Sequence, residues 1–312
     1  MRLLREIFLE ILIFRFWIII MPNLKDLKNR IESVKSTRKI TKAMQMVAAA
    51  KLRKAQEAAE QARPYAEKMS IVIEKLAFST NASSNSPLLV GNGKDKTHLI
   101  IVATSERGLC GAFNSSIVRL AKNHINHLIS DGNHIKILTI GKKGREQLKR
   151  DFGDYIIEHV DLAEIKKISY DDASNISDNI ISKFFDNEFD IATIFYNQFE
   201  SVISQIPQSS QLIPIKFKSD ELTNDDNLSN FVYEPDEQEI IEDLLPKAIS
   251  TKVFTALLEN GASEQGARMS AMDNATRNAG EMIDKLTIQF NRSRQAAITN
   301  ELIEIISGAE AL

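Results

Sequence analysis

The 312-residue sequence has one cysteine, one tryptophan, seven prolines and twelve glycines. The single cysteine, Cys110, excludes an intrachain disulfide framework and favours a reducing compartment. The formal net charge is only −3, which excludes a protein that binds nucleic acid through a large basic excess. Hydrophobic residues nevertheless make up 43% of the chain, which is enough to build one large domain or two small ones.

The small net charge conceals two blocks of opposite sign. From Ser33 to Gln56 every charged side chain is basic, and these are Lys35, Arg38, Lys39, Lys42, Lys51, Arg53 and Lys54. From Ser219 to Pro246 every charged side chain is acidic, and these are Asp220, Glu221, Asp225, Asp226, Glu234, Asp236, Glu237, Glu239, Glu242 and Asp243. This asymmetry indicates oriented contact with a partner, although a solvated helix face and an acidic surface linker would give the same pattern.

Residues 1–20 are strongly apolar and are compatible with a signal peptide, a membrane anchor or an alternative start site. Charged residues interrupt the stretch of about 20 apolar residues that a spanning helix needs, and no cleavage site of small residues follows. Met21 is a candidate for the first residue of the native chain, because a helix can begin just after it: Asn23 can cap that helix, with Asp26 three residues later. We therefore expect Met21 to be the native start and 1–20 to be an extension that the native protein lacks.

The two ends of the chain have the apolar spacing of long helices. From Leu24 to Leu76, a seam with steps of three and four residues is apolar at thirteen of sixteen positions, which predicts a coiled-coil helix. The three polar positions, Arg38, Thr41 and Gln45, are consecutive. At that point we expect the buried face to rotate toward a second apolar set, which consists of Ile40, Ala43, Met44 and Val47.

A second helical pattern covers about 236–307. Its seam consists of Met269, Met272, Thr276, Ala279, Ile283, Leu286 and Phe290, and a related face continues through Ile298, Leu302 and Ile305. The first helix ends where the central region begins, and the second begins where that region ends. If the helices pair, they must therefore run antiparallel, and the sequence predicts an antiparallel two-helix coiled coil.

The central region alternates between strand and helix patterns. The strand candidates are Thr97–Thr104, Ile135–Ile140, Tyr155–Val160, Asp190–Tyr196 and Leu212–Phe217. Such alternation predicts a Rossmann-like α/β domain with a mostly parallel sheet. The predicted organisation is an apolar extension at 1–20, an N-terminal helix at 21–78, a linker at 79–96, the α/β domain at 97–217, an acidic linker at 218–235 and a C-terminal helix at 236–312.

Neither glycine-bearing turn of the α/β region has a phosphate-binding motif. Gly108–Gly111 and Gly141–Gly144 both lack the G-x-x-x-x-G-K-[ST] and G-x-G-x-x-G patterns, so tight packing of the turns is the better interpretation. Cys110 has no histidine nearby in sequence, which favours a packed thiol over a nucleophile. His124 and His127 share a helix face without further ligands. We expect no catalytic residue, cofactor site or metal site.

Four separated blocks stand out in the assembled sequence. They are Ile40–Lys54 (ITKAMQMVAAAKLRK), Ser105–Gly111 (SERGLCG), Ala262–Gln265 with Ala267–Met269, and Ile298–Ala309 (ITNELIEIISGA). Together they resemble the gamma subunit of F-type ATP synthase, of the bacterial type. The resemblance covers about Met21 to Leu312, with the blocks in the right order.

The resemblance implies a central rotor shaft that does no covalent chemistry itself. In this family the shaft couples proton flow through the membrane sector to ATP synthesis or hydrolysis at the beta-subunit sites. The implied partners are the alpha and beta subunits of the catalytic hexamer, the epsilon subunit and the ring of c subunits. The implied location is the cytoplasmic face of the bacterial plasma membrane, reached only through the complex, and no nucleic acid is implied.

The resemblance also assigns contact residues. Lys35, Arg38, Lys39 and Lys42 share one face at helical spacing, and in this family they would meet acidic loops of the beta subunits. By motif match, the contact and coupling regions of the shaft include Met44, Arg268, Gln295, Thr299, Glu301 and Glu304. For Glu301 and Glu304, simple solvent exposure near a helix end is the alternative interpretation.

Two other functions stay open at this point. One is a non-rotary adaptor, in which a basic coiled-coil arm docks a partner and an α/β head binds a ligand. The other is a nucleotide-binding enzyme with a helical arm, which the missing phosphate motifs disfavour.

Overall fold

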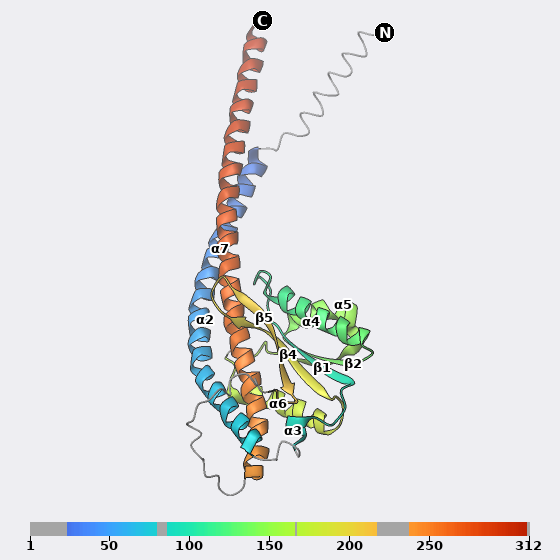
Figure 1. The fold of residues 1–312 in the computed structure, drawn as a ribbon. Helices are drawn as coiled ribbons and strands as arrows, with labels where there is room; N and C mark the ends of the chain where they lie inside the picture. Colours follow the sequence, from blue (N-terminus) through green and yellow to red (C-terminus); the bar gives the residue numbers. More distant parts are fainter. Residues whose placement is uncertain (1–23, 80–85, 166, 217–236, 311–312) are drawn as a thin grey trace, which may run out of the picture. The chain divides into compact units, whose positions relative to one another are not determined.

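The computed structural model describes residues 24–79, 86–165, 167–216 and 237–310 (Figure 1). The expected start at Met21 and the acidic linker at 218–235 lie outside the described residues. The chain divides into two compact units. We call Met1–Gln45 with Met272–Leu312 the terminal unit, and Met46–Ala271 the sheet unit.

Two long helices contribute to both units. Helix α2 covers Leu24–Ser79 and helix α7 covers Glu237–Glu310, and both continue through an internal proline, Pro64 in α2 and Pro246 in α7. In the terminal unit, Leu27 and Ile31 of α2 are buried against Ile283 and Leu286 of α7. Further along α2, Thr41 bonds to Thr276. Residue numbers thus rise along one helix as they fall along the other, which confirms the predicted antiparallel pairing.

The predicted rotation of the buried face at the polar seam positions is wrong. Thr41 is 9% exposed, whereas Ile40 is 59% exposed. Thr41 stays buried and Gln45 half-buried because α7 offers both of them partners, whereas Arg38 is exposed. Thr276 Oγ1 donates to Thr41 Oγ1 at 2.8 Å, and Gln45 Nε2 donates to Asp273 Oδ1 at 2.8 Å. A satisfied hydrogen bond removes most of the cost of keeping a polar group at a helix interface.

The sheet unit is built on five strands and their covering helices. The strands are β1 (Thr97–Ala103), β2 (His134–Ile140), β3 (Ile156–Val160), β4 (Ile191–Phe199) and β5 (Gln205–Ile213). The helices are α3 (Pro87–Val90), α4 (Phe113–Ser130), α5 (Lys142–Phe152), the 3-10 turn η2 (Gly153–Tyr155) and α6 (Tyr170–Phe185). The strand order is β3-β2-β1-β4-β5. The first four strands are parallel and β5 is antiparallel to β4, which confirms the mostly parallel sheet.

Strand β5 differs most from its prediction, because Gln205–Ile213 replaces the expected Leu212–Phe217. Its sequence, QIPQSSQLI, has little apolar alternation because β5 is an edge strand. Edge strands tolerate polar residues and proline, and Pro207 lies within this one. The segment expected as a polar linker at 79–96 contains α3, whose Leu88 and Leu89 are buried.

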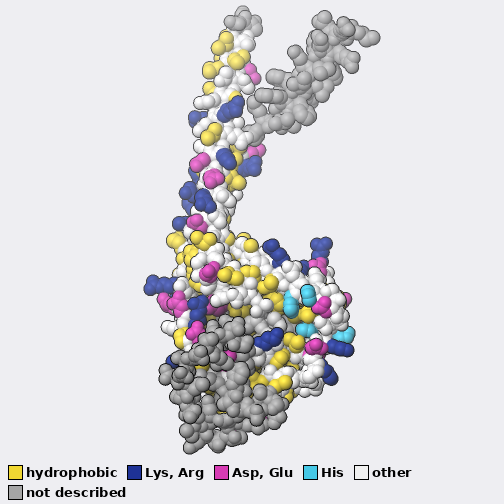
Figure 2. All heavy atoms as spheres, viewed as in Figure 1, with side chains coloured by type: hydrophobic (Ala, Val, Ile, Leu, Met, Phe, Trp, Pro, Cys, Tyr) yellow, Lys and Arg dark blue, Asp and Glu magenta, His cyan; other side chains and the backbone are white. Residues whose placement is uncertain are grey.

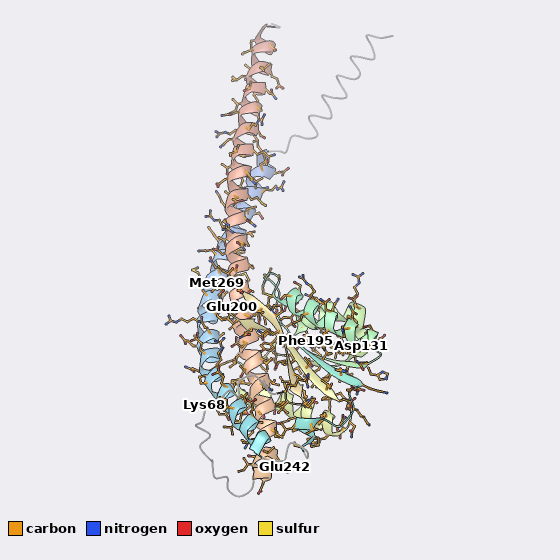
Figure 3. The ribbon with its side chains drawn as sticks, viewed as in Figure 1. Lys68, Asp131, Phe195, Glu200, Glu242 and Met269 are labelled. Carbon is orange, nitrogen blue, oxygen red and sulfur yellow. The ribbon has the colours of Figure 1, made fainter. Side chains whose placement is uncertain are left out.

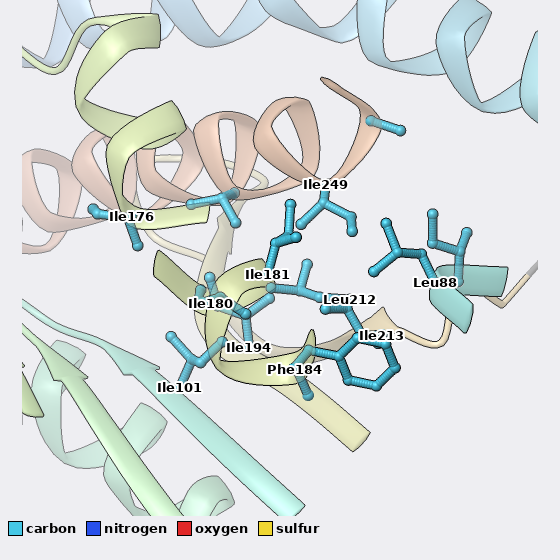
Figure 4. Close-up of a cluster of buried hydrophobic side chains, with 14 of the residues drawn as sticks. Leu88, Ile101, Ile176, Ile180, Ile181, Phe184, Ile194, Leu212, Ile213 and Ile249 are labelled. Carbon is cyan, nitrogen blue, oxygen red and sulfur yellow. The ribbon is translucent and has the colours of Figure 1, made fainter. Parts of the chain in front are cut away.

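Alternation along the strands supplies a core on each face of the sheet. Leu99 and Ile101 of β1 face a core shared with α6 and with Ile249 of α7, part of which Figure 4 shows. Ile100 and Val102 face the opposite core, which α4 and α5 cover (Figure 1). The α7 residues of the sheet unit therefore serve as a layer of the α/β sandwich itself.

Asp190 anchors the entry to β1, and its ionisation makes this anchor pH-dependent. Its carboxylate accepts hydrogen bonds from Asn92 Nδ2 (2.6 Å), Thr97 N (2.8 Å) and Lys96 N (3.1 Å). Burial alone would raise the pKa of Asp190, but these hydrogen bonds outweigh it and hold the pKa below its ordinary value. The stabilisation is therefore complete above the ordinary pKa of about 3.9 and is lost as the pH falls through the folded-state pKa.

We expect Asp190→Asn to destabilise the sheet unit by about 1–3 kcal/mol at neutral pH, because backbone donors lose a charged acceptor. The variant should also lose less of its remaining stability below the ordinary aspartate pKa than the wild type does. Unfolding free energy measured against pH checks both points. Asp154→Asn, at an exposed carboxylate, is the control, and equal acid sensitivity of all three proteins would contradict the prediction.

Candidate functional site

The four predicted basic contact residues lie exposed on α2 of the terminal unit. Lys42 Nζ donates to Gln45 Oε1 at 3.0 Å, and Gln45 is itself bonded to Asp273 of α7. Arg38 lies beside Gly280, where a Cβ would be 3.8 Å from the guanidinium carbon. Among the described residues, no carboxylate forms an ion pair with Lys35, Arg38, Lys39 or Lys42. Their charges are thus available to an acidic partner.

The predicted contact residues near the end of α7 form a separate surface. Gln295, Thr299, Glu301 and Glu304 are all exposed, and Thr299 Oγ1 donates to the Gln295 carbonyl at 2.9 Å within the helix. No hydrogen bond or ion pair between described residues joins them to the basic residues of α2, and Met44 is half-buried on α2.

Apolar side chains accompany those polar residues on α7. Ile298, Leu302 and Ile305, the expected continuation of the seam, are 49%, 54% and 68% exposed. Figure 2 shows apolar side chains interspersed with charged ones on the surface of the terminal unit. Exposed apolar side chains at this density are typical of a surface that another protein covers. Over the part of the chain that the structure describes, no helix has an apolar stretch long enough to cross a membrane.

Arg268, in the sheet unit, points inward and joins two of the four sequence blocks. Its Nη2 donates to the carbonyl oxygens of Arg107 and Gly108, at 3.3 Å each, and pairs with Glu264 at 2.6 Å. Burial raises the pKa of Glu264, and the Arg268 charge opposes that effect. The arginine thus holds the SERGLCG loop against α7.

Open α/β sheets bind ligands in a crevice at the carboxyl ends of two neighbouring strands, at the point where the strand order reverses. In this chain helix α7 occupies that crevice. Here that position lies between β1 and β4. Asn260 Oδ1 accepts from Asn197 N at 3.2 Å, and Ser263 Oγ donates to Asn197 O at 3.1 Å. These side chains of α7 stand where a ligand of the α/β head would bind, which weighs against the adaptor with a ligand-binding head.

The glycine turn at Gly141–Gly144 packs tightly, as the sequence predicts, whereas a Cβ on Gly108 or Gly111 would come no closer than 3.8 Å to its neighbours. The Glu106 carboxylate accepts from Lys142 N (3.2 Å) and Leu162 N (2.8 Å), so it occupies the N-terminus of α5, where a phosphate would otherwise bind. Gly141 has φ +88°, and a Cβ there would meet the Thr104 carbonyl oxygen at 2.2 Å. The turn after β2 is therefore filled by protein groups, which disfavours the nucleotide-binding enzyme.

Cys110 is a packed thiol, as expected. It is buried, its Sγ accepts from Asn114 Nδ2 at 3.2 Å, and burial raises the pKa of the thiol. The His124 ring lies tilted against the Phe195 ring, with 5.4 Å between their centroids, and burial lowers the pKa of His124. No group of three or more metal-ligating side chains is present among the described residues.

Sequence reasoning missed an ion pair that ties both long helices to the end of β4. Arg63 of α2 and Glu259 of α7 form it, with 2.7 Å between Nε and Oε1. Both also bond to the backbone of Phe199. The available signal was Glu259 itself, the one charged residue in the mainly apolar run FTALLENGA, because a charge at such a position requires a partner.

The family model for ATP synthase matches residues 23–312. The ATP synthase gamma chain of Jannaschia sp. is 65% identical over 296 residues, which cover 94% of this chain and 100% of that protein. The ATP synthase gamma chain of Dinoroseobacter shibae is 64% identical over 293 residues, with the same coverage.

Solved structures agree with these relatives. A chain from the OSCP/F1/c-ring part of Euglena gracilis mitochondrial ATP synthase has a TM-score of 0.66 at 20% identity, covering 92% of this chain and 94% of that one. A chain from the central stalk and c-ring of Tetrahymena thermophila mitochondrial ATP synthase has a TM-score of 0.57 at 27% identity, covering 76% and 99%. The family model and the gamma chains matched along their whole length show that this chain belongs to the ATP synthase gamma chain family.

Proposed function

We propose that this chain is the central rotor shaft of a proton-translocating ATP synthase and is itself non-catalytic. The observation that carries the proposal is the match to gamma chains over nearly the whole chain, all four sequence blocks included. The partners are then the alpha and beta subunits, the epsilon subunit and the c-subunit ring. The shaft acts at the cytoplasmic face of the bacterial plasma membrane, which it reaches through the complex.

The physical argument for the shaft is asymmetry. A rod that drives three equivalent sites in turn must bind their states with different free energies, because a ligand shifts an equilibrium only through differential binding. Around the contact of Thr41 with Thr276, all the exposed charges of α2 are positive. Over the same length α7 exposes carboxylates as well, at Asp273, Glu281 and Asp284. Each angle of such a rod presents different chemistry to a surrounding subunit.

We expect the combined variant Lys35→Ala, Arg38→Ala, Lys39→Ala and Lys42→Ala to reduce proton pumping per ATP hydrolysed. Each exposed ion pair with a partner contributes about 0.2–1 kcal/mol, so the loss of four weakens contact by roughly 1–4 kcal/mol. The sheet unit should keep its thermal stability, because none of the four belongs to it. ATP-driven acidification of inverted membrane vesicles, with ATP hydrolysis measured in parallel, checks the prediction.

The matched control removes four exposed cations from α5 instead: Lys142, Arg145, Lys149 and Arg150. If both quadruple variants pump as well as the wild type, the basic residues of α2 do not couple the shaft to its partners. If purification of the intact complex from membranes recovers this chain without alpha and beta subunits, the rotor assignment itself fails.

A further inference from the structure

Phe199, the last residue of β4, lies between both long helices within the sheet unit. Its ring belongs to a buried cluster with Leu52 of α2 and Ala262 of α7. A Cβ on Gly266 of α7 would stand 3.2 Å from the ring atom Cε2, so this glycine lets the helix approach the ring closely. Met269 of α7, which Figure 3 labels, packs against the same cluster.

The backbone of Phe199 is held as well as its ring. Glu259 Oε2 accepts from the Phe199 N–H at 3.0 Å, and Arg63 Nη2 donates to the Phe199 carbonyl at 3.3 Å. Arg63 Nε and Glu259 Oε1 close the arrangement at 2.7 Å. We call these three residues the Phe199 clamp. One peptide unit at the end of a central strand is thereby bonded to α2 and to α7 at once.

Stability by itself is a poor reason for this arrangement. The Glu259 side chain is only 5% exposed, and a buried ion pair is often no more stabilising than an apolar pair of the same volume. Charge-assisted hydrogen bonds, however, fix direction and distance in a way that apolar contacts do not. A clamp of this type resists sliding and twisting of the strand end against the two helices.

We propose that the Phe199 clamp is a torsional joint that passes torque between the α2–α7 helix pair and the sheet. Arg63 and Glu259 are its positioning residues, and they need contact no partner subunit. The proposal rests on the proposed rotor function and deepens it. It predicts that loss of the hydrogen bonds loosens the sheet against the helices while the chain stays folded and assembled.

The test uses the assembled complex, with a rotation probe on the sheet unit. The variant is Arg63→Met with Glu259→Met, which keeps the volume and removes the charges together. A gold nanorod is attached at Lys149→Cys on α5, where the side chain is exposed, and Cys110 is buried and does not compete for the label. The catalytic hexamer is immobilised, and the angular distribution of the probe is recorded during pauses in ATP-driven rotation.

We expect a wider angular distribution and a loss of proton pumping per ATP, with the rate of ATP hydrolysis unchanged. The control is Lys143→Met with Glu146→Met, which removes an ion pair within α5 alone. If the angular distribution of the probe is equally wide in the two double variants, and both pump equally many protons per ATP, the proposal that the Phe199 clamp is a torsional joint is wrong. If the parent complex neither rotates nor pumps, the proposed function fails instead.

A second variant keeps the test decisive if the double methionine protein does not assemble. Arg63→Lys keeps a charge for Glu259, but a single ammonium group replaces the fork that reaches both Glu259 and the Phe199 carbonyl. Its angular distribution should be wider than that of the α5 control. A distribution no wider than the control would overturn the proposal.

Discussion

Gly141→Ala is expected to unfold much of the sheet unit at temperatures where the wild-type chain is stable. The new Cβ would stand 2.2 Å from the Thr104 carbonyl oxygen and 2.8 Å from its carbon, both of which are backbone atoms. The residue also has φ +88°, which L side chains rarely adopt. Overpacking and backbone strain each cost about 1–3 kcal/mol, so we expect a loss of about 2–6 kcal/mol in unfolding free energy.

Hydrogen exchange measured on the full chain is the appropriate readout, because protection of the β1 and β2 amides reports on this region alone. Gly132→Ala is the control, since Gly132 has φ +78° with nothing within 4 Å of a Cβ. Gly132→Ala introduces the backbone strain of a positive φ without a steric clash, and it should lower the unfolding free energy by about 1–3 kcal/mol. If both variants lose protection equally, the contact with Thr104 is not what requires glycine at 141.

Arg63→Met alone is expected to be more damaging than the double replacement of the clamp. The single variant leaves the Glu259 carboxylate, which is 5% exposed, without its cation. Breaking a fully buried pair costs about 3–5 kcal/mol, whereas replacing both partners by apolar residues is often neutral. Because the Arg63 side chain is 39% exposed and water reaches this pair, we expect a smaller loss of about 1–3 kcal/mol for the single variant. The second change, Glu259→Met, should therefore restore part of the stability that the first removes, because it eliminates the unpaired charge but leaves the Phe199 N–H without its acceptor.

Denaturant unfolding of the four members of this double-mutant cycle measures the coupling energy. Lys143→Met, at an ion pair whose side chains are 32% and 46% exposed, is the control and should leave the unfolding free energy nearly unchanged. Additive effects of the two substitutions would show that Arg63 and Glu259 do not compensate each other. The same cycle shows whether the double variant is stable enough to be used in the rotation measurement.

The sequence was informative wherever a local repeat governs the structure. Helical spacing marked α2 and α7, and apolar runs marked β1 and β2 to within a residue of their observed limits. The limits of strand β5 were predicted wrongly, because an edge strand needs little apolar alternation. Resemblance of the four blocks identified the family, and exposure of the basic residues on α2 follows directly from their charge and spacing.

Tertiary contacts decided which polar groups are inside. Apolar spacing favoured Ile40 over Thr41 as a buried residue, and only the partner Thr276 on α7 reversed that preference. Arg268 was expected among the contact and coupling residues, yet its bonds run to carbonyl groups of the SERGLCG loop. Whether it also touches a partner subunit stays a prediction.

The Phe199 clamp shows the division most clearly. Arg63 and Glu259 are 196 residues apart in the chain, and neither has a local pattern that points to the other. By itself, the sequence determined the helices, most of the strands and the family, because periodicity and short motifs act over a few residues. Only the tertiary structure decided which charges meet and what they hold, because burial and partnership depend on residues that folding brings together.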